Sequence, residues 1–195
     1  MVGVAFQQLQ NCGEVTVTTA TAMEYAGDGG THALSHQQFN AFYALTARAL
    51  RAYICRMAGS AAMADDILQE SYIRLLVAPP MAEEHRKAYL YRTATNLVTD
   101  HWRAQTRRRL WWSLFPRRQE AADGGVELAS DMQRLFRQIG PRERALLWLA
   151  YVEGADHREI ASILQLREKS IRVLLFRARR KMEAILKENG FEGHS

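Results

Sequence analysis

The sequence predicts an all-α protein made of two small helical domains joined by a flexible linker. Apolar residues recur at the three- and four-residue spacing of amphipathic helices through 35–109 and again through 127–190. Between these stretches, Pro116 and the pair Gly124-Gly125 interrupt any regular helix. The pattern therefore predicts a three-helix N-terminal domain, a linker at 110–126 and a C-terminal helix-turn-helix domain.

Residues 1–34 are expected to form a mostly disordered extension. They mix Val, Thr, Ala and Gly, and an alternating run at 15–19 has no neighbouring segment with which it could pair as a strand. Translation beginning at Met23 would explain this composition, a hypothesis that the intact mass of the native protein would test. The other end of the chain, 191–195, is expected to be a short tail.

The first domain, 35–109, is predicted to be a bundle of three helices with a core of its own. Its helices are expected at 35–57, 63–77 and 82–109. Ser35 and Gln38 have the spacing of a capping box at the first helix. Asp65 and Asp66 favour the start of the second helix through its dipole. The pair Pro79-Pro80 forces a loop before the third helix, because neither proline can continue a helix.

The second domain, 127–190, is predicted to end in a helix-turn-helix. Two helices are expected first, at 128–139 and 141–152. The helix-turn-helix follows at 156–181, with one helix on each side of a three-residue turn at 165–167. Asp156 and Glu159 have capping-box spacing at the first of the paired helices. The second carries cationic residues between its apolar positions, which suits the major groove of DNA. A solvated basic helix is the alternative.

The positive charge of the chain is clustered. The formal net charge is +5, yet residues 1–47 contain no Lys or Arg, and the excess lies in two runs at 103–118 and 167–181. Clustered cations are typical of a protein that binds a polyanion. No apolar run is long enough to span a bilayer, and the N-terminus lacks the features of a secretory signal. We therefore expect a cytoplasmic protein without membrane insertion.

No pattern in the sequence predicts an enzyme, a metal site or a cofactor. His157 and Glu159 are too close together for a zinc-protease motif, and no Gly-rich phosphate loop occurs. His101 follows Asp100 but has no nucleophile at a recognisable spacing. Cys55 lies on an apolar helical face and is expected to be a small buried side chain.

Three motifs together resemble the extracytoplasmic-function (ECF) group of the bacterial sigma-70 family, over about 35–187. They are DDILQESYIRL at 65–75, AYLYRTATNLVTDHWR at 88–103, and the segment 139–180 that contains the helix-turn-helix. The resemblance implies a subunit that binds core RNA polymerase and directs initiation at specific promoters. It would recognise the −35 element as duplex DNA and the opened −10 element as single strands. Members of the family are often held inactive by an anti-sigma protein, which is a further candidate partner.

The first motif is the candidate polymerase-binding site. Asp65, Asp66, Gln69 and Glu70 can line one side of a helix. An acidic and amide face suits a partner surface that bears arginines, and the resemblance implies that it docks on the clamp helices of the polymerase. The alternative is a helix face that is merely solvated.

The second motif is the candidate −10 site. Arg92 and Asn96 are four residues apart and so share a helix face, and the resemblance implies that they hold bases of the non-template strand. The aromatic residues Tyr89, Tyr91 and Trp102 are available to stack on unpaired bases, although for Trp102 a place in the core is the stronger expectation.

Arginines follow the second motif. Arg103 belongs to the candidate −10 site but is three residues from Asp100, with which it can pair locally instead. Arg107 and Arg108, with Arg109 after them, form a run that would neutralise phosphates. By resemblance, the linker that comes next would thread into the polymerase channels.

The third motif is the candidate −35 site, with Lys169, Ser170, Arg172 and Arg177 as the residues expected to contact DNA. It departs from the family at the turn, where Gln165 replaces the usual Gly. If Gln165 adopts a positive φ in this turn, the backbone strain costs of order 1 kcal/mol.

The second helix of this motif also departs from the family at two positions that are often polar or basic. Leu174 is expected to pack inward. Val173 is expected to face outward, where it could contact a thymine methyl or a partner protein.

The alternative function is a helix-turn-helix transcriptional regulator that acts without core polymerase. It accounts for the segment 156–181. It leaves the acidic helix at 65–75 and the shared face of Arg92 and Asn96 without an explanation. The sigma-factor interpretation accounts for all three.

Overall fold

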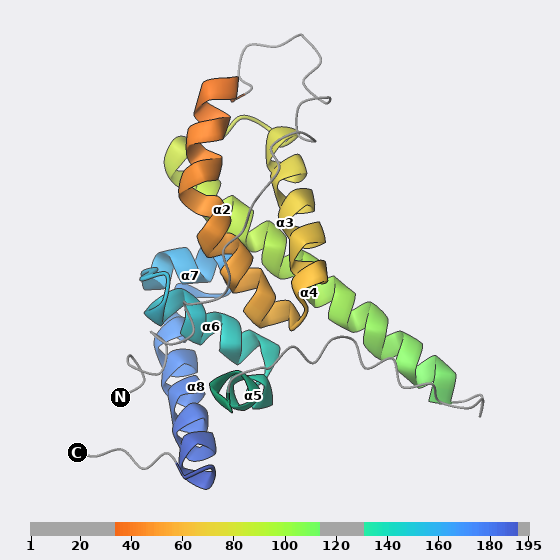
Figure 1. The fold of residues 1–195 in the computed structure, drawn as a ribbon. Coiled ribbons are helices and arrows are strands. Elements are labelled where there is room, and N and C mark those ends of the chain that lie inside the picture. The colour runs from red at the N-terminus through yellow and green to blue at the C-terminus, as the bar shows by residue number, and fades with distance from the viewer. Residues whose placement is uncertain (1–33, 114–130, 191–195) are drawn as a thin grey trace.

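The computed structural model describes residues 34–113 and 131–190 (Figure 1). Every regular element among them is an α-helix, which confirms the predicted fold class. The helices are α2 (His36–Ala58), α3 (Ala61–Leu76), α4 (Glu83–Ser113), α5 (Asp131–Gln138), α6 (Pro141–Tyr151), α7 (His157–Leu164) and α8 (Glu168–Glu188). None of these helices combines the length and the apolar character needed to cross a membrane. Of the extension predicted at 1–34, residues 1–33 lie outside the described residues, as does the tail at 191–195.

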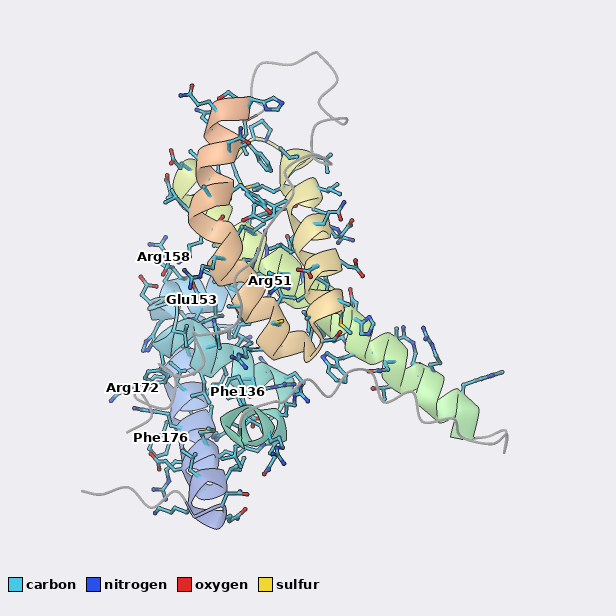
Figure 2. All side chains as sticks on the ribbon, in the orientation of Figure 1. Arg51, Phe136, Glu153, Arg158, Arg172 and Phe176 are labelled. Carbon is cyan, nitrogen blue, oxygen red and sulfur yellow. The ribbon has the colours of Figure 1, made fainter. Side chains whose placement is uncertain are left out.

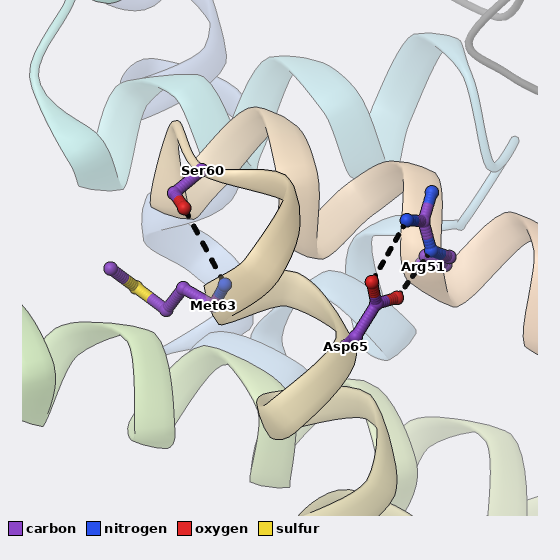
Figure 3. Close-up of polar contacts among 4 residues, drawn as sticks. All are labelled: Arg51, Ser60, Met63 and Asp65. Carbon is purple, nitrogen blue, oxygen red and sulfur yellow. Dashed lines mark hydrogen bonds and ion pairs between the residues drawn. The ribbon is translucent and has the colours of Figure 1, made fainter. Parts of the chain in front are cut away.

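Local capping residues set the ends of α2 and the start of α3. The predicted capping box is confirmed: the Ser35 hydroxyl accepts from the Gln38 N–H at 3.2 Å, and the Gln38 side chain accepts from the Ser35 N–H at 3.1 Å. α2 ends at Gly59, whose φ of 77° suits a residue without a Cβ. α3 begins earlier than predicted, because the Ser60 hydroxyl accepts from the Met63 N–H at 3.5 Å (Figure 3).

α4 is the longest described helix. The loop at Pro79-Pro80 separates it from α3, as predicted, and it begins at Glu83. It continues to Ser113, so the first residues assigned to the linker, 110–113, are helical, whereas 114–126 lie outside the described residues. Figure 1 shows the C-terminal part of α4 extending away from the other helices.

In the N-terminal half, aromatic residues join α2 and α4. Tyr53 and Leu90 are fully buried, and the Tyr53 hydroxyl shares a hydrogen bond of 2.7 Å with the Thr95 hydroxyl. The indole N–H of Trp102 donates to the Met57 carbonyl at 3.2 Å. Trp102 is therefore a structural residue, as was the stronger expectation.

α6 is the central helix of the C-terminal half. It begins at Pro141, in the first turn as predicted, and its Leu147 and Trp148 are buried. α7 and α8 form the predicted helix-turn-helix, and the turn consists of 165–167. α8 ends at Glu188, before the pair Asn189-Gly190.

The two halves pack directly against each other, because α7 contacts α4 and α6 contacts α2. Two arginines of the C-terminal half cap the carboxyl end of α2. Arg144, only 5% exposed, donates to the Arg56 carbonyl at 3.2 Å, and Arg137 donates to the Gly59 carbonyl at 3.1 Å. Carbonyls at the end of a helix carry partial negative charge, so guanidinium groups are favoured there. Burial, and then the charge of Arg137, lower the pKa of the Arg144 guanidinium.

Candidate functional site

The polar residues of the first motif lie toward solvent on α3. Asp65, Asp66 and Gln69 are exposed, and Glu70 is half-buried. The start of α3 at Ala61 leaves its first turn without an acidic residue, so the predicted effect of Asp65 and Asp66 on the helix dipole is wrong.

Asp65 is instead paired with an arginine of α2. Arg51 donates to both carboxylate oxygens of Asp65, at 2.6 Å from Nε and 3.1 Å from Nη2 (Figure 3). Such a two-point contact fixes the orientation of both groups. Asp65 therefore joins α3 to α2, while Asp66 and Gln69 make no hydrogen bond or ion pair within the described residues and stay open to a partner.

The same face of α3 continues into apolar residues that the sequence analysis missed. Ile73 and Val77, seven and eleven residues after Asp66, are exposed, Val77 to 73%. Between them and Asp66, Glu70 is held by Arg74 at 2.7 Å. Residues seven and eleven positions apart lie on the same face of a helix, so the sequence spacing from Asp66 could have predicted this patch. The surface of α3 thus combines carboxylates with apolar side chains, and protein interfaces commonly have an apolar centre with a polar rim.

α4 brings Tyr89, Arg92 and Asn96 to one face. Asn96 is exposed, and the other two are half-buried. The guanidinium carbon of Arg92 lies 5.4 Å from the centre of the Tyr89 ring, which is within the range of a cation–π contact. The pair is therefore held in place beside a free side-chain amide, which can both donate and accept hydrogen bonds.

Tyr91 does not belong to this face, and its predicted availability for stacking is wrong. It is 1% exposed, and its ring centre lies 5.3 Å from that of Tyr53. Two residues along an α-helix rotate by about 200°, so Tyr91 points nearly opposite to Tyr89. Burial, and then the charge of Glu153, raise the pKa of the Tyr91 hydroxyl. Glu153 also lies 3.7 Å from Lys87 of α4, so this corner is part of the contact between the two halves.

Arginines continue along the extended part of α4. Arg103, Arg107 and Arg108 are exposed. Arg103 lies 3.7 Å from Asp100, which confirms the predicted local pair, but both side chains are exposed and the pair is weak. Phosphates can therefore compete for Arg103, while Arg107 and Arg108 add to the same basic segment.

The cations of the third motif face solvent on α8. Lys169, Arg172 and Arg177 are exposed and make no ion pair within the described residues, and Ser170 is half-buried. Gln165 in the turn before α8 has a φ of 53° and a ψ of 49°. It therefore adopts the left-handed conformation whose strain the sequence analysis anticipated.

Two apolar residues share the outer surface of α8. Val173 is 50% exposed, as predicted, whereas Leu174 packs against the core, also as predicted. Phe176 is 57% exposed and was not singled out from the sequence, although it lies outside the apolar stripe of Ile171 and Leu175. Figure 2 shows Phe176 and Arg172 on α8.

The described residues contain no group of three His, Cys, Asp or Glu side chains that could hold a metal ion. The Cys55 thiol is half-buried against the core. An open hollow of about 700 Å³ is lined by Tyr151, His157, Arg158 and Glu168, among others. The candidate contact residues on α3, α4 and α8 lie mainly on exposed helix faces.

Two protein-family models match the chain. Sigma-70 region 2 matches residues 42–108, and Sigma-70, region 4 matches residues 130–182. The first match contains α3 and nearly all of α4, and the second contains the helix-turn-helix. Together they cover more than half of the chain, in the same order as the three motifs.

Curated relatives carry the same assignment. The chain is 29% identical over 153 residues to the probable ECF RNA polymerase sigma factor SigI of Mycobacterium tuberculosis, a match that covers 69% of this chain. It spans about half, 52%, of that relative. It is also 25% identical over 169 residues to the ECF RNA polymerase sigma factor SigL of the same species, covering 83% of this chain and 96% of SigL.

A solved structure has a similar fold. It is the sigma factor RpoE of Bartonella quintana, determined in complex with the anti-sigma factor NepR. The TM-score is 0.56 at 18% sequence identity, over 77% of this chain and 98% of that one. This similarity supports the helical architecture of both halves.

Proposed function

Because the chain belongs to the ECF group of the sigma-70 family, we propose that it is a promoter-specificity subunit of RNA polymerase. It binds core polymerase, recognises a −35 element as duplex DNA and holds an opened −10 element as single strands. It performs no covalent chemistry and needs no cofactor, and it acts in the cytoplasm, where the polymerase and the chromosome are.

One observation carries this proposal. Three exposed faces of different chemistry occur on α3, α4 and α8, within the two segments that match the family models. A DNA-binding protein that acts alone has no use for the carboxylate and apolar face of α3. A protein that must hold both a polymerase and a promoter needs all three.

The face of α3 is the polymerase-docking surface. Asp66 and Gln69 are free to meet basic and polar groups, and Ile73 and Val77 add apolar contact area beside them. Charged groups set the orientation and the rate of such docking, and apolar contacts slow dissociation. Asp65 supports this surface through its contact with Arg51.

The faces of α8 and α4 divide the work on DNA. α8 enters the major groove of the −35 element, where Lys169, Arg172 and Arg177 contact phosphates or base edges. On α4, Asn96 hydrogen-bonds a base that has left the duplex, and the stacked pair of Tyr89 and Arg92 supports it. The arginines farther along α4 neutralise the phosphates of the opened strand.

An anti-sigma protein is a third partner class, because the similar RpoE was solved in complex with one. The same faces that bind polymerase and DNA are the ones such a protein would have to cover. Its binding would therefore compete with core polymerase for Asp66 and Gln69, or with DNA for α8.

Replacing Asn96 with Ala tests the role of α4. We expect Asn96→Ala to reduce the yield of open promoter complexes, measured as permanganate-reactive thymines, by about tenfold, the value of one good base contact. Binding to core polymerase should not change. His101→Ala is the matched control, because His101 is also exposed but lies about 140° farther round the helix. An unchanged yield of open complexes with Asn96→Ala would refute the role given to this residue.

A further inference from the structure

The outer surface of α8 has an apolar centre. The buried residues of α8 (Ile171, Leu175, Ala178, Met182 and Ile185) mark its inner side. With 3.6 residues per turn, Val173 and Phe176 lie about 140–160° from the middle of that side. They are therefore among the side chains that project away from the protein, and they are 50% and 57% exposed.

Cations surround this apolar centre. Lys169 comes four residues before Val173, and Arg180 comes four residues after Phe176, so all four lie in one row. Arg172 and Arg177 flank the row, and like Lys169 and Arg180 they are exposed. The surface therefore matches a partner that is strongly anionic at its edges and apolar in the middle.

The major groove of duplex DNA has this composition. Its rims are phosphates, and its floor carries one apolar group, the C5-methyl of thymine. A protein helix that docked on this surface would need an apolar stripe bordered by carboxylates. The row of cations and its position on the second helix of a helix-turn-helix favour DNA.

We propose that Val173 and Phe176 recognise thymine methyl groups in the upstream promoter element. The inference rests on the proposed function and adds which chemical group of the bases α8 recognises. Neither side chain has a hydrogen-bonding group, so this pair distinguishes bases by the presence of the methyl alone. Hydrogen bonding and phosphate contacts remain with Lys169, Arg172 and Arg177.

Replacing thymine with deoxyuridine provides a direct test, because it removes only the methyl and keeps every hydrogen-bonding group. Duplexes are first selected from a random library by the full chain bound to core polymerase. In a selected upstream duplex, each thymine is then changed singly to deoxyuridine, and binding is followed by fluorescence anisotropy. We expect one or two positions at which the change weakens binding about three- to fivefold, as the loss of one buried methyl predicts.

Variants of the chain assign the effect to these side chains. Val173→Ser and Phe176→Ala should each make binding at one of those positions equal for thymine and deoxyuridine. Arg177→Ala is the matched control: it should weaken binding to both duplexes while the ratio between them stays three- to fivefold. All three side chains are exposed, and unchanged thermal melting would show that the variants are folded.

The possible failures are distinguishable. If the duplexes bind and Arg177→Ala weakens them, but no deoxyuridine change matters, the inference is overturned while the proposed function stands. If no sequence is enriched and Arg177→Ala changes nothing, the proposed function fails as well. If Val173→Ser and Phe176→Ala leave DNA binding unchanged but weaken binding of another protein, the row is a protein-binding surface and the inference is overturned.

Discussion

The polar face of α3 and the basic face of α8 differ both in the sign of their charge and in the freedom of their side chains. On α3, Asp65 and Glu70 are each held by a nearby arginine. On α8, Lys169, Arg172 and Arg177 make no ion pair within the described residues. The α3 face is thus partly fixed in advance, whereas these three cations of α8 have no ion-pair partner within the described residues.

The difference matches the partners proposed for each face. A protein partner has one shape, so a face whose side chains are already oriented loses less entropy on docking. A DNA backbone offers closely spaced phosphates, which mobile cations can reach in several ways, and its binding weakens steeply with salt. We therefore expect the complex with DNA to be far more sensitive to salt than the complex with polymerase.

Charge reversal on α3 is expected to have the largest effect. Asp66→Arg should weaken binding to core polymerase about a hundredfold, because like charges placed together at an interface cost several kcal/mol. Binding of the −35 duplex by the free chain should not change. Glu188→Arg makes the same change of charge at an exposed position at the end of α8 and should leave polymerase binding intact. Equal loss with both variants would show that net charge, and not the face of α3, governs docking.

The opposite experiment is made on α8. Arg172→Ala should weaken binding of the −35 duplex by about 1–3 kcal/mol if Arg172 contacts a base, with relaxed specificity at one position. If it contacts only phosphate, the loss should be uniform across sequences and the salt dependence shallower. Polymerase binding should be unaffected. Loss of polymerase binding instead would remove the division of labour between the two faces.

A substitution at the contact between the two halves tests how much this contact contributes to the stability of the protein. Arg144→Ala removes the buried guanidinium that caps α2 and leaves the Arg56 carbonyl without that donor. We expect the free energy of unfolding, measured by urea denaturation, to fall by about 1–3 kcal/mol. The exposed neighbour Arg142 on the same helix provides the control, and Arg142→Ala should have little effect. No loss of stability with Arg144→Ala would mean that the cap is not formed in solution.

The smallest expected effect is a gain in stability, from a substitution in the turn before α8. Gln165→Gly should remove a left-handed penalty of about 1–2 kcal/mol but lose about 0.4–1 kcal/mol to the freer unfolded chain. The net stabilisation, measured by thermal melting, should be roughly 0.5–1 kcal/mol. Gln165→Ala keeps the Cβ and serves as the control, with no gain expected. A destabilised Gly variant would show that the Gln165 side chain contributes contacts of its own.

The sequence predicted those features that depend on neighbouring residues. The capping box of Ser35 and Gln38 and the turn at 165–167 were placed correctly, because the groups involved are a few residues apart. The same holds for the box of Asp156 and Glu159, whose two hydrogen bonds measure 2.8 and 3.1 Å.

Features that depend on distant parts of the chain were missed. Nothing near Arg144 in the sequence indicates a buried arginine, because its acceptor is the carbonyl of Arg56. Tyr91 has the sequence context of an aromatic residue beside a base-binding face, yet its ring packs against Tyr53 of another helix. Phe176 was also missed, but its exposure could have been predicted from the sequence, because its spacing places it opposite the apolar stripe of α8.

The central claim is that the chain acts as part of RNA polymerase, and the most direct test is its binding to purified core enzyme. We expect the full chain to elute with core polymerase as a stable complex, to support initiation at selected promoters, and to lose both properties with Asp66→Arg. A chain that binds selected DNA duplexes but does not bind core polymerase would contradict the account, and would instead identify a helix-turn-helix regulator that acts alone.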